Sequence, residues 1–214
     1  MTFPHELLDD ESTLASFRGW SEEVYRDFFR LRNGEMSDEE FSEKYHWERA
    51  ILSMDMTGFT ASAMRRGELQ SFLRIMDAQR VAIPVLRECG AEIIRCFADD
   101  IVAIFEDANA ALDAAFETHR RVRLFNDSSL STDYPTQCCA GIGFGRVFAI
   151  GPNSAQGDEM NRASKLGEDI ARANETLITE RAFAAVSSRD DVSFEQQDQD
   201  DQLFPFYRAS PRDA

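Results

Sequence analysis

Apolar residues recur at helical spacing near the start of the chain. Four of them, separated by three or four residues, predict an amphipathic helix. These are Trp20, Val24, Phe28 and Leu31. A second helix is expected to begin after Ser37, because Ser37 followed by Glu40 forms a capping-box pattern. Residues 1–46 are also acidic and rich in aromatic side chains. We therefore expect a helical arm that packs on the rest of the protein or on a partner chain.

From residue 47 onward, short apolar strands alternate with longer helical stretches. The expected elements are a strand at 48–56, a helix at 67–88, a hairpin at 91–105, a helix at 107–125, strands at 137–144 and 147–150, a helix from Asp158, a strand at 176–179 and a hairpin pairing 192–194 with 204–208. Pro84 should kink or end the first of these helices, and Gly90 should terminate it.

The order strand, helix, hairpin, helix, strand predicts an α+β protein with a ferredoxin-like βαββαβ fold. In this layout the helices cover one face of a mostly antiparallel sheet. The chain then divides into an arm, residues 1–46, and a domain, residues 47–214.

The composition narrows the possible partners. With 39 acidic and 23 basic residues, the net charge is −16. That charge disfavours binding to nucleic acid or to an anionic membrane. No apolar run approaches the roughly 20 residues that span a bilayer, and the N-terminus lacks a signal-peptide pattern. The cysteines, including the adjacent pair Cys138 and Cys139, are expected to be small core residues of a cytoplasmic protein.

Two strands lead into acidic residues that gain nothing from burial. Asp55 follows the apolar run 51–54, and Asp99 lies in the turn of the hairpin 91–105. In a βαββαβ sheet the two positions are neighbours, so the carboxylates can converge. Mg²⁺ and Mn²⁺ prefer oxygen ligands, and the Met56 carbonyl could supply another. This pattern predicts a metal site for phosphoryl chemistry. The alternative is that Asp99 only forms a turn and Asp55 only caps one.

Two further segments could hold a substrate. The turn after Asp55 can cradle phosphate oxygens with its backbone N–H groups. Its residues are Thr57, Gly58, Phe59 and Thr60. On the helix expected from Asp158, Asn161 and Lys165 are four residues apart and share a face. A neutral donor beside a cation suits a ribose and a charged transition-state phosphate. Taken alone, the same residues could be an ordinary solvated helix face.

These blocks together resemble the catalytic domain of the class III nucleotidyl cyclases, the adenylate and guanylate cyclase family. The family pattern Asp-x-x-Gly-Phe-Thr corresponds to residues 55–60, and Lys-x-x-Gly-Asp-Gly to residues 95–100. Gly-Asp-x-x-Asn-x-x-Ala-Arg-Leu corresponds to residues 157–166, and Gly-Ile-x-x-Gly-x-Val is similar to part of residues 140–147. The resemblance extends over about residues 47–208.

The resemblance implies a head-to-tail homodimer with active sites at the interface. Asp55 and Asp99 of one chain would hold two divalent ions, Mg²⁺ or Mn²⁺, and Asn161 and Lys165 would come from the other chain. In such a site the 3′-hydroxyl of a nucleoside triphosphate attacks the α-phosphorus and pyrophosphate leaves. The product is a 3′,5′-cyclic nucleotide.

The chain departs from the family where the base is read. Arg95 occupies a position held by Lys in adenylate cyclases and by Glu in guanylate cyclases, and Ser154 falls at the opposite position unless an insertion shifts it. Arg has donors only, so it suits the acceptor-rich edge of uracil or cytosine. These features are similar to the standalone bacterial pyrimidine cyclases of antiviral signalling. We expect UTP, with CTP possible. If Arg95 only replaces Lys, the substrate is ATP.

A second departure concerns catalysis. Lys165 stands where most members of the family have Arg, and it lacks the planar guanidinium fork. Arg146 or Arg162 could compensate. An inactive, nucleotide-binding regulatory homologue therefore remains an alternative. A cyclic-dinucleotide synthase is a poorer match, because the segment 98–101 lacks the Gly-Gly-Asp/Glu-Glu/Asp-Phe hairpin.

Overall fold

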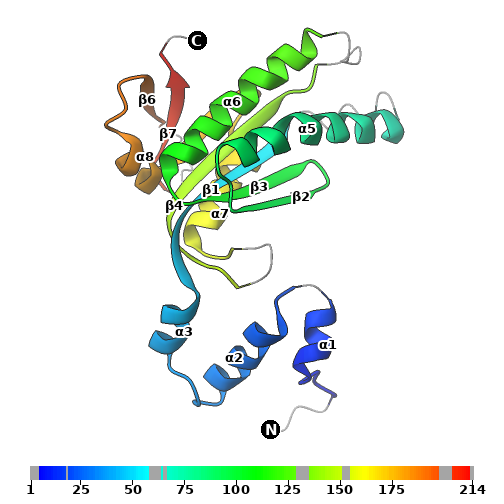
Figure 1. The fold of residues 1–214 in the computed structure, drawn as a ribbon, viewed down its shortest axis with the longest axis vertical. Helices are drawn as coiled ribbons and strands as arrows, with labels where there is room; N and C mark the ends of the chain where they lie inside the picture. The colour runs from blue at the N-terminus through cyan, green and yellow to red at the C-terminus, as the bar shows by residue number, and fades with distance from the viewer. Residues whose placement is uncertain are drawn as a thin grey trace.

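The computed structural model describes residues 5–17, 19–57, 64, 67–128, 135–150, 155–197 and 204–212. Its first part consists of three short helices, α1 (Glu11–Ser16), α2 (Glu22–Arg32) and α3 (Asp38–Tyr45). The predicted capping box of α3 is present, since the Ser37 hydroxyl accepts from the Glu40 N–H and the Glu40 carboxylate accepts from the Ser37 N–H. Figure 1 shows α1 and α2 set apart from the sheet, with α3 running directly into its first strand.

Aromatic packing joins this arm to the rest of the protein. Phe41 and Tyr45 of α3 are buried together with Val24 and Ile150. The ring of Phe41 also lies 5.8 Å from that of Phe148, measured between centroids. Buried aromatic contacts of this kind are held mainly by the apolar area that they remove from water. The arm therefore packs against the C-terminal end of β4 and the residues that follow it.

Seven strands form one mixed sheet. They are β1 (His46–Met56), β2 (Ile93–Phe97), β3 (Asp100–Phe105), β4 (Cys138–Phe148), β5 (Thr176–Thr179), β6 (Val192–Gln197) and β7 (Phe206–Pro211). The strand order is β2-β3-β1-β4-β5-β7-β6, with β4 and β5 parallel and the other neighbours antiparallel. The part β2-β3-β1-β4 is the arrangement that the βαββαβ pattern predicted.

The sequence suggested two strands where the structure has one. Residues 138–148 pair with β1 along its whole length, from Met56–Cys138 to His46–Phe148. Gly145 lies within the strand, paired with Arg49, and has a φ of 153° that a side chain would disfavour. The prediction of separate strands at 137–144 and 147–150 was wrong because the pairing with β1 continues through Gly145 and Arg146.

The helices of this part are α5 (Glu68–Glu88), α6 (Ala108–Asn126), α7 (Asp158–Ser164), the π-helix η1 (Lys165–Ile170) and α8 (Glu180–Val186). Pro84 lies within α5 and does not end it, whereas Gly90 has the left-handed φ of 84° expected of a terminator. The pattern did not predict α8 or the π-helix. Among the residues that the structure describes, no helix is long and apolar enough to cross a membrane.

Helices cover both faces of the sheet, which corrects the prediction that they cover one. Leu52 and Met54 of β1 pack with α5 and α6, whereas Ile51 packs with Ala163 of α7. Successive side chains of a strand point to opposite faces, so both sets are buried and residues 50–54 form a continuous buried run. Figure 1 shows α5 and α6 together across one face.

Two glycines allow α7 and η1 to approach the sheet closely. A Cβ on Gly141 of β4 would lie 2.1 Å from the carbonyl oxygen of Ala163. A Cβ on Gly167 of η1 would lie 2.5 Å from the carbonyl oxygen of Ser53 in β1. The helix backbone therefore rests directly on the backbones of β1 and β4. This contact sets the distance between the sheet and the side chains of η1 that lie over the end of β1.

Candidate metal centre and active site

Three carboxylates converge at one end of the sheet. Asp55 is the second-last residue of β1, Asp99 lies in the turn between β2 and β3, and Asp100 begins β3. One ligand oxygen of each lies within 4.8 Å of the others, and all three residues are half-buried. The pairing of Met54 with Ile101 explains this, because it brings the end of β1 beside the start of β3. Asp55 and Asp99 thus meet as expected, and Asp100 joins them.

The carboxylates raise one another's affinity for protons. The pKa of Asp55 is raised to about 6, mainly by burial and further by the charges of Asp99, Asp100 and Glu168. The N–H of Met56 donates to the Asp55 carboxylate at 2.6 Å and opposes that increase. The pKa of Asp100 is also raised, first by burial and then by Glu168 and Asp99. Such a concentration of negative charge is stabilised by a bound cation.

Glu168 is a further acidic residue of the site that the sequence interpretation missed. It lies on η1, and its Oε1 accepts a hydrogen bond of 3.2 Å from the buried hydroxyl of Ser53. Its charge acts on both Asp55 and Asp100. Ser53 and Asp55 are two residues apart on one strand and therefore face the same side of the sheet. No local motif marks Glu168, because only the close packing of η1 on β1 brings it here.

The donor set fits a hard divalent cation. Mg²⁺ and Mn²⁺ take carboxylate oxygens and commonly share them with substrate phosphates. The hydroxyl group of Thr57 is buried beside this end of β1 and interacts with the Cys139 thiol. Asp55, Asp99 and Asp100 would hold the cation.

Asn161 and Lys165 lie on the exposed surface of α7 and η1. The backbone N–H of Lys165 bonds to the carbonyl of Asn161, so the two side chains share a face as predicted. The Lys165 ammonium group forms an ion pair with Asp169 at 2.6 Å. Within the described part of this single chain, neither side chain bonds to the three clustered carboxylates. Both residues are exposed.

The structure places some of the remaining predicted residues. Arg95 of β2 is exposed, and its charge opposes the rise in the pKa of Asp100, so it lies on the carboxylate side of the hairpin. Met56 is buried at the end of β1, and the N–H of Thr57 donates to the carbonyl of Gln137 at 2.9 Å. The other predicted substrate contacts lie outside the described residues. They are Gly58, Phe59, Thr60 and Ser154.

The arrangement of strands and helices is shared with solved cyclase structures. The adenylyl cyclase CyaB from P. aeruginosa aligns with 79% of this chain and 97% of its own, at 18% identity and a TM-score of 0.65. An adenylate/guanylate cyclase/hydrolase from Silicibacter pomeroyi aligns with 78% of this chain and 98% of its own, at 22% identity and a TM-score of 0.65. The chain has the cyclase fold.

A third match with the cyclase fold is the guanylate cyclase domain of RhGC from Catenaria anguillulae, solved in complex with GTP. It has 14% identity and a TM-score of 0.63, and covers 78% of this chain and 98% of its own. No protein-family model and no curated protein sequence matches the chain. The shared property is thus the class III cyclase fold, and the identity of the nucleotide must be argued from the residues themselves.

Proposed function

We propose that this protein is a metal-dependent nucleotide cyclase, which converts a nucleoside triphosphate into its 3′,5′-cyclic monophosphate and pyrophosphate. The observation that supports this most strongly is the cluster of Asp55, Asp99 and Asp100 at the end of β1 within a cyclase fold. A structural acidic turn would gain nothing from bringing three carboxylates within 4.8 Å of one another. A site for cations and a triphosphate does gain from it.

Each residue has a proposed role in this reaction. When bound, two divalent ions would lower the pKa of the ribose 3′-hydroxyl and neutralise the triphosphate. Asp55 and Asp99 would hold these ions, and Asp100 would add a third carboxylate. The 3′-hydroxyl loses its proton to solvent water, its oxygen forms a bond to the α-phosphorus, and the bond from that phosphorus to the leaving pyrophosphate breaks. Asn161 positions the ribose, and the Lys165 ammonium group stabilises charge on the transferred phosphoryl group.

A second copy of the chain would complete each site. Asn161 and Lys165 face outward from the chain that carries them, and four large apolar residues of α5 are also exposed. We call these residues the α5 stripe; they are Leu69, Phe72, Leu73 and Met76. Exposed apolar surface of this kind is typical of a protein interface. The guanylyl cyclase domain of RhoGC from Blastocladiella emersonii, which has the same fold, forms a non-canonical dimer in one crystal structure and is monomeric in two others.

Arg95 favours a pyrimidine nucleotide as substrate, UTP first and CTP second. Its guanidinium group has five donors and no acceptor, so it cannot accept the N–H groups of guanine. It matches the O2 and O4 acceptors of uracil better than the edge of adenine, which carries a donor amino group. Its long side chain also leaves less room for a purine. The product would be cyclic UMP, with a role as a second messenger in antiviral defence, and ATP is the alternative substrate.

The direct test is to incubate the purified protein with each of the four nucleoside triphosphates and Mn²⁺ or Mg²⁺, and to identify the products by mass spectrometry. We expect cyclic UMP in excess over the other cyclic nucleotides. Asp55→Asn and Asp99→Asn should each abolish turnover, whereas Asp127→Asn, at the exposed end of α6, should not. Absence of any cyclic nucleotide from the folded wild-type protein would refute the proposal.

Arg95→Ala provides the test of base selection. If Arg95 reads the base, the variant should lose its preference among the four triphosphates while Mn²⁺ binding remains unchanged. A wild-type protein that prefers ATP, with the same preference in Arg95→Ala, would exclude Arg95 as the residue that reads the base.

Mixing two inactive variants tests the shared active site. A dimer of one Asp55→Asn chain and one Lys165→Ala chain contains one intact site, so random exchange should restore roughly a quarter of wild-type activity. The matched control mixes Asp55→Asn with Asp99→Asn. Both changes affect the metal-binding half of a site, so no intact site can form. Equal activity in the two mixtures would exclude the intersubunit arrangement.

A further inference from the structure

A buried carboxylate on α7 has no role in the chemistry proposed above. Glu159 is the second residue of this helix, two positions before Asn161, and it is 1% exposed. The cyclase sequence pattern leaves this position unspecified, between Asp158 and Asn161. A buried charged group costs free energy unless hydrogen bonds or an opposite charge compensate for it. The contacts of Glu159 therefore indicate what an acidic residue does here.

One oxygen of the Glu159 carboxylate, Oε2, connects α7 to two strands of the sheet. It accepts a hydrogen bond of 2.7 Å from the hydroxyl group of Thr179, at the end of β5, and one of 3.2 Å from the N–H of Phe144 in β4. The parallel pairing with β5 covers only residues 140–142 of β4, so the Phe144 N–H lies beyond it. Glu159 thus provides an acceptor that a longer β5 would otherwise supply.

The other carboxylate oxygen of Glu159 has a weaker contact. Oε1 lies 3.8 Å from Nε of Arg181, whose side chain is 65% exposed. An ion pair of that length and exposure contributes little, so the hydrogen bonds to Oε2 are the main attachment. Glycines of β4 make room for this approach. A Cβ on Gly143 would lie 2.5 Å from the carbonyl oxygen of Glu159, and a Cβ on Gly145 would lie 3.1 Å from its Cγ.

This attachment holds the end of α7 that has no side-chain cap. The N-cap residue is Gly157, which forms no capping hydrogen bond of this kind. The other end of the helix is held where the carbonyl group of Ala163 lies against Gly141 of β4. Glu159 and Ala163 therefore fix a helix of seven residues at both ends. Asn161 lies between these two points.

We propose that Glu159 is a positioning residue for the cyclase reaction, an inference that rests on the proposed function. It holds α7 so that Asn161 and Lys165, which directly follows the helix, meet the substrate in a fixed orientation. Glu159 itself does not contact the nucleotide and acts through its hydrogen bonds to Phe144 and Thr179. Glu159→Leu removes both hydrogen bonds, whereas Glu159→Gln retains an amide oxygen that can accept both of them.

Steady-state kinetics of the full-length protein, with Mn²⁺ and its best triphosphate substrate, test this role. Glu159→Leu should lower kcat at least about tenfold with a smaller change in KM, because displaced transition-state groups mainly slow turnover. Glu159→Gln should keep kcat within about threefold of the wild type, since the geometry of α7 is retained. If Glu159→Leu does not fold, Thr179→Val tests the same attachment, with Thr179→Ser as the control that retains the hydroxyl group.

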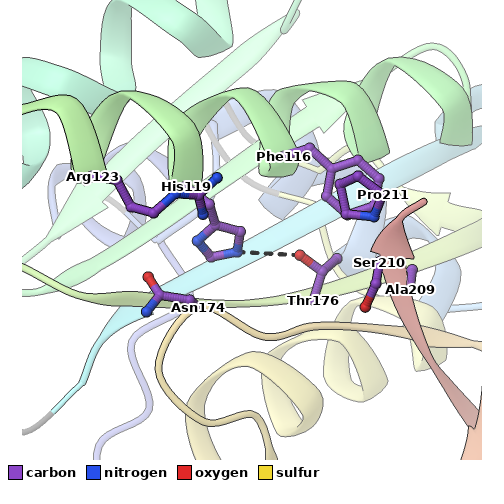
Figure 2. Close-up of a pocket in the computed structure, with 8 residues that line it drawn as sticks. All are labelled: Phe116, His119, Arg123, Asn174, Thr176, Ala209, Ser210 and Pro211. Carbon is purple, nitrogen blue, oxygen red and sulfur yellow. Dashed lines mark hydrogen bonds between the residues drawn. The ribbon is translucent and has the colours of Figure 1, made fainter. Parts of the chain in front are cut away.

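His119→Leu is the matched control for loss of a buried hydrogen bond. The His119 side chain on α6 is buried, and its Nε2 lies 3.2 Å from the hydroxyl oxygen of Thr176 in β5 (Figure 2). Thr176 and Thr179 are three residues apart on one strand, so their side chains point to opposite faces of the sheet. His119→Leu therefore leaves α7 in place, and its kcat should equal that of the wild type.

Hydrogen exchange followed by mass spectrometry gives a readout that does not depend on turnover. Residues 158–164 should exchange faster in Glu159→Leu than in the wild type, while α5 and α6 exchange at the wild-type rate. The inference is overturned if exchange in α7 or kcat is unchanged in Glu159→Leu, or if Glu159→Gln or His119→Leu loses as much kcat as Glu159→Leu. A folded wild-type protein that forms no cyclic nucleotide would instead refute the proposed function.

Discussion

Asp55 lies in a position where its ionised form destabilises the fold. Its pKa is raised from 3.8 to about 6 in the folded chain, so the native state binds a proton more tightly than the unfolded state between these values. The free energy of unfolding should therefore fall as the pH rises through this window, and the penalty is complete above about pH 6. Half-exposure weakens the effect through solvent screening.

Asp55→Asn should consequently stabilise the metal-free protein at pH 7, by on the order of 1 kcal/mol. The measurement is urea unfolding in the presence of a chelator, at pH 7 and at pH 4, where the difference between variant and wild type should shrink. Added Mn²⁺ should raise the melting temperature of the wild type and leave that of the variant unchanged. An Asp55→Asn protein less stable than the wild type at pH 7 would contradict this view of the cluster.

Ala98 carries backbone strain at the tip of the hairpin. Ala98 is the residue before Asp99 and has a φ of 51°, a left-handed conformation that is unfavourable for a residue with a side chain. The cyclase sequence pattern has Gly at this position. Ala98→Gly should raise the free energy of unfolding by about 0.5–1 kcal/mol, after allowing for the greater freedom of Gly in the unfolded chain. Denaturant titration measures it. The opposite sign is expected for Ala110→Gly within α6, and a loss of stability in both variants would exclude strain at Ala98.

At the scale of elements, the crossing of α7 and η1 over the sheet depends on contact between backbones. Gly141→Ala places a methyl group 2.1 Å from the Ala163 carbonyl oxygen, so the helix must move away from β4. We expect a loss of about 3 kcal/mol or more in unfolding free energy, and a loss of turnover because Glu168 moves with η1. Gly90→Ala is the comparison. Its φ of +84° is strained, but no atom lies within 4 Å of the added methyl group, so it should cost only about 1–2 kcal/mol. Equal losses would show that the close contact is unimportant.

The elements that the sequence predicted are those with a strong local pattern. The helices α5 and α6 and the hairpin β2–β3 have long periodic runs or a clear turn, so their positions follow from residue spacing. The continuity of β4 does not, because Gly141, Gly143 and Gly145 have little intrinsic preference for a strand and are held by pairing with β1. The sequence does not predict the π-helix η1 either, because a six-residue segment with one wider turn has no periodic pattern of apolar residues.

The residues of the candidate site also fall into two groups, those that a local sequence pattern predicts and those that only the tertiary structure brings together. Asp55 and Asp99 could be predicted because each lies at or just beyond the end of a recognisable apolar run. Asp100 is brought in by the register of β1 and β3, and Glu168 by the packing of η1 on Ser53. The stripe on α5 shows a further limit, because Leu69 and Phe72 have the periodicity of a core helix but are 69% and 56% exposed. Periodicity identifies an apolar face without saying which surface covers it.

At the scale of the whole molecule, the α5 stripe should decide the oligomeric state. Phe72→Asp puts a charge into a surface that we propose is covered by a second chain, so the variant should dissociate at concentrations where the wild type is dimeric. Analytical ultracentrifugation measures this, and turnover should fall in parallel while Mn²⁺ binding per chain is retained. Leu124→Asp, at a residue that is 55% exposed on α6, is the matched control. Phe72→Asp that stays dimeric and active would exclude the stripe as the interface.

The buried contact between α3 and the end of β4 also has a practical consequence for anyone who shortens this chain. Phe148 and Ile150 are covered by Phe41 and Tyr45, so a truncation at residue 46 would expose an apolar surface at the end of β4. Such a fragment should aggregate or express poorly even though it retains the carboxylate cluster. Helices α2 and α3 thus protect an apolar surface of the sheet from water.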